Sequence, residues 1–184
     1  MQKAPHVTQA PKAPSERPPR GPIVSSEHLS RSSLELSELE FGMIIAGHAF
    51  NRWMVRCMTA TGYPELGALD VLVLHSVNHR ERAKRQADIC LVLNVEDTHT
   101  VTYALKKLAR LALVVGEKQG KETFFRTTET GRDACSRYAE IREACLVDSL
   151  ASMGIEREEM SRLAGLLRAM SGLYDQAARS AASL

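Results

Sequence analysis

The segment from Thr98 to Val115, THTVTYALKKLARLALVV, places the strongest constraint on the fold of this chain. Its apolar positions recur at spacings that place them on one face of a helix. These positions are Val101, Leu105, Leu108 and either Leu111 or Leu113. The other face carries hydroxyl, imidazole and phenol groups first and lysines afterwards. No glycine separates this segment from the β-branched pair at 114–115, so the residues predict an amphipathic helix followed directly by a strand.

The neighbouring residues predict a compact set of elements around that helix. Two helices are expected upstream, over about Leu66 to His79 and Arg85 to Leu93. We expect the first to place Leu69, Leu72 and Val73 on one side, and the second to bury Ala87, Cys90 and Leu91 or nearby positions. Asn94 or Asp97 can cap the helix that follows. Downstream, Val114–Val115 and Thr123–Thr127 predict a two-stranded hairpin around a turn region at Gly116–Gly120.

Long helices are predicted on both sides of this central part. From Ser33 to the stop at Gly62 and Pro64, apolar residues alternate at spacings of three and four, which is a heptad seam. This seam comprises Leu36, Leu39, Met43, Ala46, Phe50, Trp53 and Cys57. Thr128 can cap a further helix that buries Tyr138, Ile141 and Cys145. The helix after Gly154 carries a second seam, made of Met160, Leu163, Leu167, Met170 and Tyr174.

The chain is therefore expected to be mainly α-helical, with a small two-stranded β-wing, and to divide into four parts. Residues 1–32 hold six of the seven prolines and are expected to form a disordered arm. Residues 33–62 form a long dimerisation helix, residues 63–130 form a winged helix-turn-helix domain, and residues 131–184 form C-terminal dimerisation helices. The expected fold class is a winged helix-turn-helix joined to a helical dimerisation domain.

Composition limits the classes of function that remain. The chain has 184 residues, 44% hydrophobic and 25% charged, which is ordinary for a globular protein. It has no apolar run long enough to span a membrane and no signal peptide, so we expect a cytoplasmic protein. Its four cysteines are scattered without a CxxC pair, which predicts reduced thiols. No nucleotide-binding or hydrolase motif is present, so we expect neither an enzyme nor a cofactor.

The arrangement of cations indicates the partner. The net charge of +2 is too small to identify a polyanion partner, but the positive charge is concentrated in the middle of the chain. Three helices followed by a hairpin are typical of a winged helix-turn-helix, whose last helix enters the major groove of double-stranded DNA. The predicted groove contacts are Thr98, His99, Thr100, Thr102 and Tyr103. Lys106, Lys107 and the wing residues Lys118, Lys121 and Arg126 are expected to contact DNA mainly through phosphates.

Three stretches also resemble a known family. LGALDVLVLHSVNH, ADICLVLNVEDTHTVTYALKKLARLALV and TTETGRD are similar to the second helix, the helix-turn-helix and the start of the post-wing helix of MarR-family bacterial transcription regulators. The similarity covers about residues 34–175. Within the family, the chain resembles the LdtR-like branch. It implies a homodimer that reads a pseudo-palindromic operator, usually a repressor released by a small, often aromatic anion.

The resemblance also implies a ligand site and shows two departures. Relatives build their effector pocket where this chain has His48, Phe50, Arg52, Trp53 and Arg56. The family commonly has an Asp-x-Arg pattern in the wing, whereas this chain has GEKQGKETFFRTT with no aspartate. Glycine often precedes the first wing strand in the family, and Ala112 stands there instead.

Two other kinds of function remain open. One is a DNA-binding regulator with a different trigger, in which His75 and His79, one helical turn apart, bind a metal ion, or Cys57 near Arg52 and Arg56 senses oxidants. For these residues a hydrogen-bonded histidine pair and a buried seam cysteine are the favoured interpretations, so no metal site is predicted. The other is a helical protein-interaction module that does not bind DNA.

Overall fold

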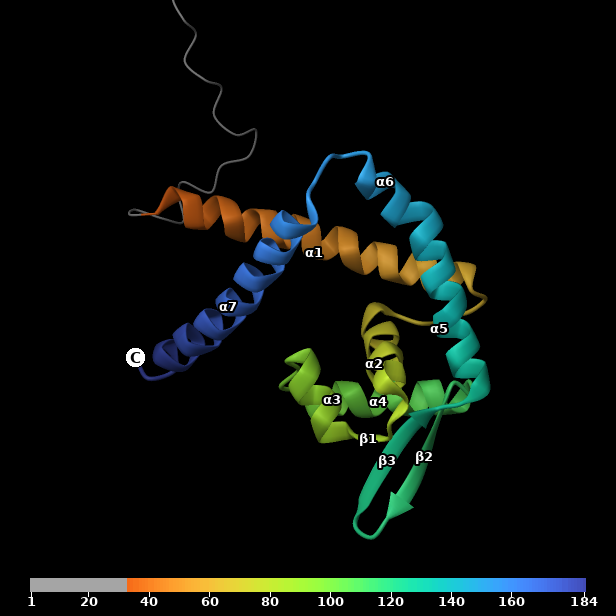
Figure 1. The fold of residues 1–184 in the computed structure, drawn as a ribbon. Helices are drawn as coiled ribbons and strands as arrows, with labels where there is room; N and C mark the ends of the chain where they lie inside the picture. The colour runs from red at the N-terminus through yellow and green to blue at the C-terminus, as the bar shows by residue number, and fades with distance from the viewer. Residues whose placement is uncertain (1–32) are drawn as a thin grey trace, which may run out of the picture. The chain divides into compact units, whose positions relative to one another are not determined.

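A computed structural model describes residues 33–184, apart from the side chains of Glu81 and Ala151. The arm predicted for residues 1–32 lies outside the described residues. Contacts divide the chain into two units, Met1–Ala49 and Phe50–Leu184. In the described part of the chain, no helix is both long enough and apolar enough to cross a membrane. The order of helices and strands is shown in Figure 1.

Helix α1 spans Leu34–Ala60 and confirms the first long helix. It ends where the sequence predicts, because Gly62 adopts a left-handed φ of 103° and Pro64 follows shortly after. In the second unit, α1 turns Met54, Cys57 and Met58 into the core. Phe50, which the seam also includes, is 53% exposed.

The helix-turn-helix follows in the predicted order. Helix α2 covers Ala68–Asn78, the short 3-10 turn η2 covers His79–Glu81, α3 covers Gln86–Leu93 and α4 covers Thr98–Arg110. Asn94 ends α3 in the left-handed conformation, with φ of 52°, so it serves as the C-cap of that helix. Asp97 caps α4.

The sheet has one strand more than predicted. Strand β1 (Lys84–Arg85) pairs with β3 (Glu122–Thr127), which pairs with β2 (Val114–Gln119), and both pairings are antiparallel. A two-residue strand shows no alternation, so the sequence could not reveal β1. The wing turn is also shorter than predicted, because β2 continues through Gly116 as far as Gln119. Gln119 pairs with Glu122, and Gly120 takes the positive φ of 64°.

The C-terminal part is helical throughout most of its length. Helix α5 covers Glu129–Arg142 and runs into the π-helical turn η3 (Glu143–Val147) and the short α6 (Asp148–Ala151). Helix α7 follows over Arg157–Ala181. Thr128 caps α5 as predicted, since its hydroxyl oxygen accepts a hydrogen bond from the Gly131 amide at 3.0 Å.

The core lies among the C-terminal end of α1, α2, α3, α4, the start of the wing and α5. Its largest fully buried side chains include Met58, Leu66, Leu74, Ile89, Leu105, Leu108 and Leu113. The predicted buried stripe of α4 is confirmed at Val101, Leu105 and Leu108, with Leu113 rather than Leu111 as its fully buried end.

Burial on the shorter helices was predicted only in part, correctly for Cys90 and Val73. On α3 the buried pair is Ile89 and Cys90, whereas Ala87 is exposed and Leu91 is 82% exposed. On α2 the fully buried residues are Val71, Val73, Leu74 and Val77, and Leu69 and Leu72 are only partly buried. Cys145 is exposed. Helices of 8 and 11 residues contain too few turns for the spacing of apolar residues to define the buried face.

Candidate nucleic-acid interface

The outer face of α4 carries four side chains in one stripe. His99, Tyr103, Lys106 and Arg110 follow one another at i, i+4, i+7 and i+11, opposite the buried stripe, and all four are exposed. Tyr103 is 71% exposed, and the Lys106 ammonium lies 6.0 Å from the centre of its ring. The stripe therefore presents an imidazole, a phenol and two cations on a helix whose opposite face is buried in the core.

The hydroxyl groups of α4 lie beside this stripe and take part in local hydrogen bonds. The Thr100 hydroxyl donates to the carbonyl of Asp97 at 2.7 Å, and the Thr102 hydroxyl donates to the carbonyl of Thr98 at 3.0 Å. Asp97 accepts a hydrogen bond from the His99 amide at 2.9 Å. Each hydroxyl oxygen keeps a lone pair, so Thr98, Thr100 and Thr102 remain able to accept a further hydrogen bond.

Gln86 is a contact that the sequence reasoning missed. Its Nε2 donates to the carbonyl of Thr98 and to the hydroxyl of Thr102, both at 2.8 Å. Gln86 is the first residue of α3, so this side chain fixes the start of α4 against the start of α3. A glutamine at a helix start gives no pattern in a single sequence, which explains why it was missed.

Lys107 lies outside the exposed stripe. Its ammonium donates to Asp70 Oδ2 at 2.7 Å and to the carbonyl of Glu65 at 2.5 Å. Asp70 Oδ2 also accepts a hydrogen bond from the Gly67 amide at 2.9 Å. This network joins α4 to the start of α2, so in this structure the Lys107 charge is neutralised within the protein.

The wing presents three of the predicted cations. Lys118 and Lys121 are exposed at its tip, on either side of Gly120. Arg126 forms an ion pair with Glu117 on the neighbouring strand. Glu117 of β2 thus pairs with the wing arginine, although the aspartate that the family commonly has in the wing is missing here.

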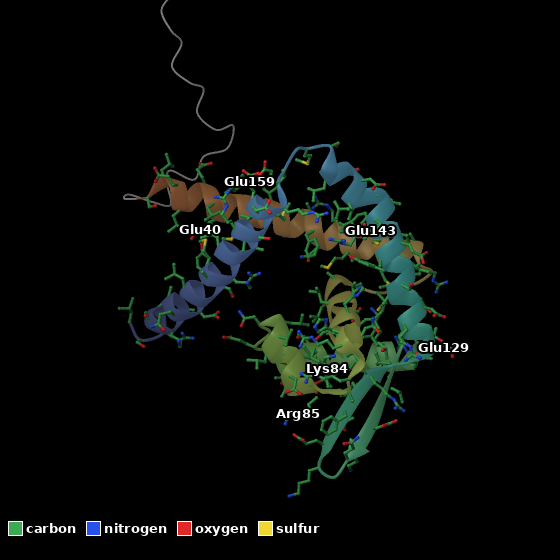
Figure 2. All side chains as sticks on the ribbon, viewed as in Figure 1. Glu40, Lys84, Arg85, Glu129, Glu143 and Glu159 are labelled. Atoms are coloured by element: carbon green, nitrogen blue, oxygen red, sulfur yellow. The ribbon has the colours of Figure 1, made fainter. Side chains whose placement is uncertain are left out.

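Arg85 connects the wing to the helix-turn-helix. Its guanidinium pairs with Asp88 at 2.9 Å and with Glu122 at 3.1 Å. These interactions hold the pKa of the Asp88 carboxyl below its usual range, chiefly through the Arg85 side-chain hydrogen bond. Figure 2 labels Arg85 beside Lys84 near the start of α3. Arg85 therefore links the start of α3 to β3 near the tip of the wing, and its charge is already paired.

A cavity of about 660 Å³ lies away from this surface, among α1, α2 and α5. Three aromatic side chains line it, Phe50 and Trp53 from α1 and Tyr138 from α5. Leu72 and His75 of α2 line it as well. Arg132 and Arg142 of α5 also line it. Aromatic walls with cations nearby are suited to a small aromatic anion.

Of the residues predicted to bind the ligand, the structure brings only Phe50 and Trp53 to this cavity. Trp53 lines it, whereas Arg52 and Arg56 line a separate depression of about 400 Å³ that also contains Ala68. His48 is exposed and belongs to the first unit, Met1–Ala49. Arg52 and Arg56 are four residues apart, so they lie on the same face of α1 and line this depression together.

His75 stands at the wall of the cavity and is held by packing. Its ring meets that of Tyr138 edge-on, with 4.6 Å between centroids. Its Nε2 is buried without a hydrogen-bond partner, and burial lowers the pKa of the imidazole. The favoured hydrogen-bonded pair with exposed His79 is therefore wrong. Among the described residues, no group of three or more potential metal ligands is found.

Cys57 is buried in the core. Its thiol donates to the carbonyl of Tyr138 at 3.6 Å, and burial, with a smaller contribution from Cys145, raises its pKa. An oxidant-sensing cysteine needs thiolate character, which a lowered pKa provides. The surroundings of Cys57 act in the opposite direction, as expected for a buried core cysteine.

Comparisons with known proteins agree with this architecture. Residues 66–131 match the family model described as a winged helix DNA-binding domain. A MarR-family transcriptional regulator from Rhodococcus sp. RHA1 is 16% identical with a TM-score of 0.58, covering 77% of this chain and 97% of that one. CouR from Rhodococcus jostii RHA1, solved with p-coumaroyl-CoA, is 16% identical with a TM-score of 0.59, covering 77% and 95%.

The transcriptional regulator SlyA is 20% identical with a TM-score of 0.56, covering 74% of this chain and 92% of that one. Comparison with curated protein sequences gives no match. The region from Leu66 to Gly131 therefore has a winged helix fold. Together with its flanking helices, the chain has the fold of the MarR-family transcription regulators. This confirms the predicted fold class.

Proposed function

We propose that this protein is a MarR-family transcription regulator that binds a pseudo-palindromic operator as a homodimer and is released from it by a small aromatic anion. Repression is the mode of action that we infer. The observation that carries the proposal is the exposed stripe of α4, His99, Tyr103, Lys106 and Arg110, on the helix that a winged helix-turn-helix inserts into the major groove.

The residue types of the stripe suit the groove. Near the N-terminus of α4, the side chains of His99 and Tyr103 can donate to or accept from base edges, as can the hydroxyls of Thr98, Thr100 and Thr102. Farther along, Lys106 and Arg110 lie where a helix leaves the groove and phosphates are near. Lys118, Lys121 and Arg126 of the wing provide further backbone contacts. We assign Lys107 a supporting role, because Asp70 and Glu65 already neutralise and bind its ammonium.

Binding to DNA can be tested at the level of single residues. Duplexes selected from random DNA provide the operator, and affinity is then measured over a range of salt concentrations. Lys106→Ala should weaken binding to all sequences and reduce the slope of log K against log salt by about 1. Tyr103→Phe should instead change the preferred sequence with little change in that slope. Arg137→Ala, an exposed cation of α5, is the matched control.

Two results would contradict the proposal that α4 binds DNA. If Thr102→Ala combined with Lys106→Ala binds the selected duplex as tightly as the unaltered protein, with folding intact, α4 is not the recognition helix. If no duplex is selected at low salt, the protein is the helical interaction module instead.

The proposal of a homodimer is based on apolar side chains that are exposed in the single chain. On α7, Leu163, Leu166, Leu167 and Leu173 are between 40% and 61% exposed. On α1, Leu36, Ile44, Ile45 and Phe50 are between 41% and 56% exposed. Two copies joined through such faces would carry two recognition helices, whose spacing must be about 34 Å to enter successive major grooves. Sedimentation measurements that find only monomers at micromolar concentrations would rule out this assembly.

The effector is assigned to the aromatic cavity between α1, α2 and α5. Phe50, Trp53 and Tyr138 can stack on a ring, and Arg132 can pair with a carboxylate. The CouR structure contains p-coumaroyl-CoA, which supports a small-molecule effector for a protein of this fold. The LdtR-like branch remains a prediction.

Trp53 is the only tryptophan of the chain, so its fluorescence can report on the cavity. Titration with 4-hydroxycinnamate should quench its emission and release the selected duplex. Arg132→Ala should weaken both effects together, whereas Arg52→Ala, outside the cavity, should leave both unchanged. If quenching occurs without release, the cavity binds the acid but does not regulate DNA binding.

A further inference from the structure

A second cavity, of about 560 Å³, adjoins α2 and the C-terminal end of α3. Its apolar wall is aliphatic, formed by Leu72, Val92 and Leu93. Val92 is 72% exposed, so one side of this wall is open to solvent. Leu72 and His75 line both cavities, but Phe50, Trp53 and Tyr138 line only the first. The two cavities therefore differ in the kind of apolar group that they can accommodate.

The polar side of the second cavity is cationic. Arg80 and Arg82 line it together with His79, and all three side chains are exposed. Neither arginine forms a salt bridge with any acidic side chain that the structure describes, in contrast to Arg85, whose guanidinium pairs with both Asp88 and Glu122. Two guanidinium groups beside an aliphatic wall can bind an oxyanion attached to an apolar chain.

The loop that carries these arginines is held in place by Lys84. This side chain is buried, and its ammonium donates to the carbonyls of Val77 at 3.1 Å, His79 at 2.5 Å and Arg82 at 3.3 Å. Arg80 adopts a left-handed backbone conformation, with φ of 59° and ψ of 21°, which is unfavourable for a residue with a side chain. Figure 2 labels Lys84 close to the start of α3. The loop is therefore preorganised, which reduces the entropy lost when a ligand binds.

From this combination we propose that the second cavity is a binding site for aliphatic carboxylates, with the carboxylate held between Arg80 and Arg82 and the chain lying against Leu72, Val92 and Leu93. The volume lies within the range of small-molecule sites. An aliphatic chain fits better than an aromatic ring because Leu72, Val92 and Leu93 form the apolar wall, and the rings among the lining residues are the polar imidazoles of His75 and His79. The site does not depend on DNA binding, so it stands or falls separately from the proposed regulatory function.

The test uses the full chain without DNA and octanoate as the probe. Calorimetric titration should show saturable binding that is at least about 10-fold tighter than binding of octan-1-ol, because the alcohol cannot form the charge-assisted hydrogen bonds. Octylammonium should not bind measurably. Trp53 emission should stay unchanged, since Trp53 lines only the first cavity.

Two variants locate the probe. Arg82→Ala should weaken octanoate binding by about 10- to 100-fold, and Val92→Asp should weaken it through charge repulsion. Both positions are exposed, so circular dichroism and thermal melting should match those of the unaltered protein. Arg132→Ala, at the first cavity, is the matched control and should leave octanoate binding unchanged.

Several results would overturn the proposal. Absence of saturable octanoate binding would do so, as would equal binding of octylammonium. Quenching of Trp53 together with loss of octanoate binding in Arg132→Ala would place the carboxylate in the first cavity. If Arg82→Ala weakens binding to duplex DNA but leaves octanoate binding unchanged, the arginine is a phosphate contact instead.

Discussion

The winged helix domain and the long helices α1 and α7 differ in how far their apolar side chains are buried within the single chain. Within residues 66–131, the apolar stripe of α4 is buried by α2, α3 and the start of the wing, and Val101 and Leu108 have no exposed surface. On α7, by contrast, Met170 is the one buried residue, and four leucines are 40% to 61% exposed. The domain is complete within one chain, whereas α7 has an apolar face that still lacks a partner.

This difference indicates that the domain and α7 are stabilised by different contacts. Folding of the winged helix domain should depend on contacts within the chain, because its helix ends are capped and its core is closed. The stability of α7 should depend on protein concentration, since association would bury its apolar face. Each of the following predictions tests one side of this comparison, beginning with the largest effect.

Gly131→Ala should disrupt the domain. A Cβ at this position would lie 2.0 Å from the carbonyl oxygen of Leu113, and backbone cannot move aside as a flexible side chain can. We expect a loss of more than about 3 kcal/mol in the free energy of unfolding, at the upper end for overpacking. Urea denaturation followed by circular dichroism measures it.

Gly172→Ala is the matched control, because it also lies in a helix but has nothing within 4 Å of the new Cβ. It should raise helix stability by about 0.4–1 kcal/mol. If the two variants unfold alike, α5 does not pack as closely on Leu113 as described.

The Gly131 contact also illustrates what the sequence could predict. The order of helices and strands follows from local signals: Thr128 as a cap, Gly62 as a stop, and the spacing of Val101, Leu105 and Leu108. The close approach of Gly131 to Leu113 joins residues 18 positions apart, and no local pattern marks it. The same holds for β1, which becomes a strand only because β3 lies beside it.

The candidate site was predictable in part. The outer face of α4 follows from helical spacing, so His99, Tyr103 and Lys106 were identified correctly as exposed. Lys107 was grouped with them because spacing alone does not reveal Asp70, which lies 37 positions away and pairs with it. The aromatic cavity was placed on α1 alone, since the contribution of α5 through Tyr138 and Arg132 depends on tertiary packing.

Replacing exposed leucines of α7 should break association without affecting the domain. In Leu166→Asp combined with Leu173→Asp, each buried leucine lost removes about 1.5–3 kcal/mol from the interface, so the dimer dissociation constant should rise at least about 100-fold. Sedimentation equilibrium measures this. Leu91→Asp, on an exposed position of α3, should leave the dissociation constant unchanged. A double variant that remains dimeric would show that α7 is not the interface.

Acid should destabilise the winged helix domain through His75. Burial lowers the pKa of this imidazole from its usual value of 6.5, so below pH 6.5 the unfolded chain binds more protons than the folded one. The free energy of unfolding should therefore fall as the pH drops from 6.5 towards the folded-state pKa, by at most about 1.4 kcal/mol per pH unit. His75→Phe should remove this part of the acid sensitivity, with the ring still packed on Tyr138.

Urea titrations of the unaltered protein and of His75→Phe between pH 8 and pH 5 provide the measurement. His79→Gln, one turn away and exposed, is the control and should retain the acid response. Identical pH dependence for His75→Phe and the unaltered protein would mean that His75 is hydrated in the folded state.

The smallest effect compares two helix starts. Thr128 accepts a hydrogen bond from the Gly131 amide at 3.0 Å, whereas at the start of α7 it is the backbone amide of Glu156 that donates to the Glu159 carboxylate, at 3.4 Å. Thr128→Ala should therefore cost about 1 kcal/mol in the free energy of unfolding of the domain, and Glu156→Ala only a few tenths. Because the Thr128 hydroxyl also reaches the carbonyl of Ala112 at 2.6 Å, Thr128→Ser should restore most of the loss. If the two variants lose the same free energy of unfolding, the Thr128 cap stabilises the start of α5 no more than Glu156 stabilises the start of α7.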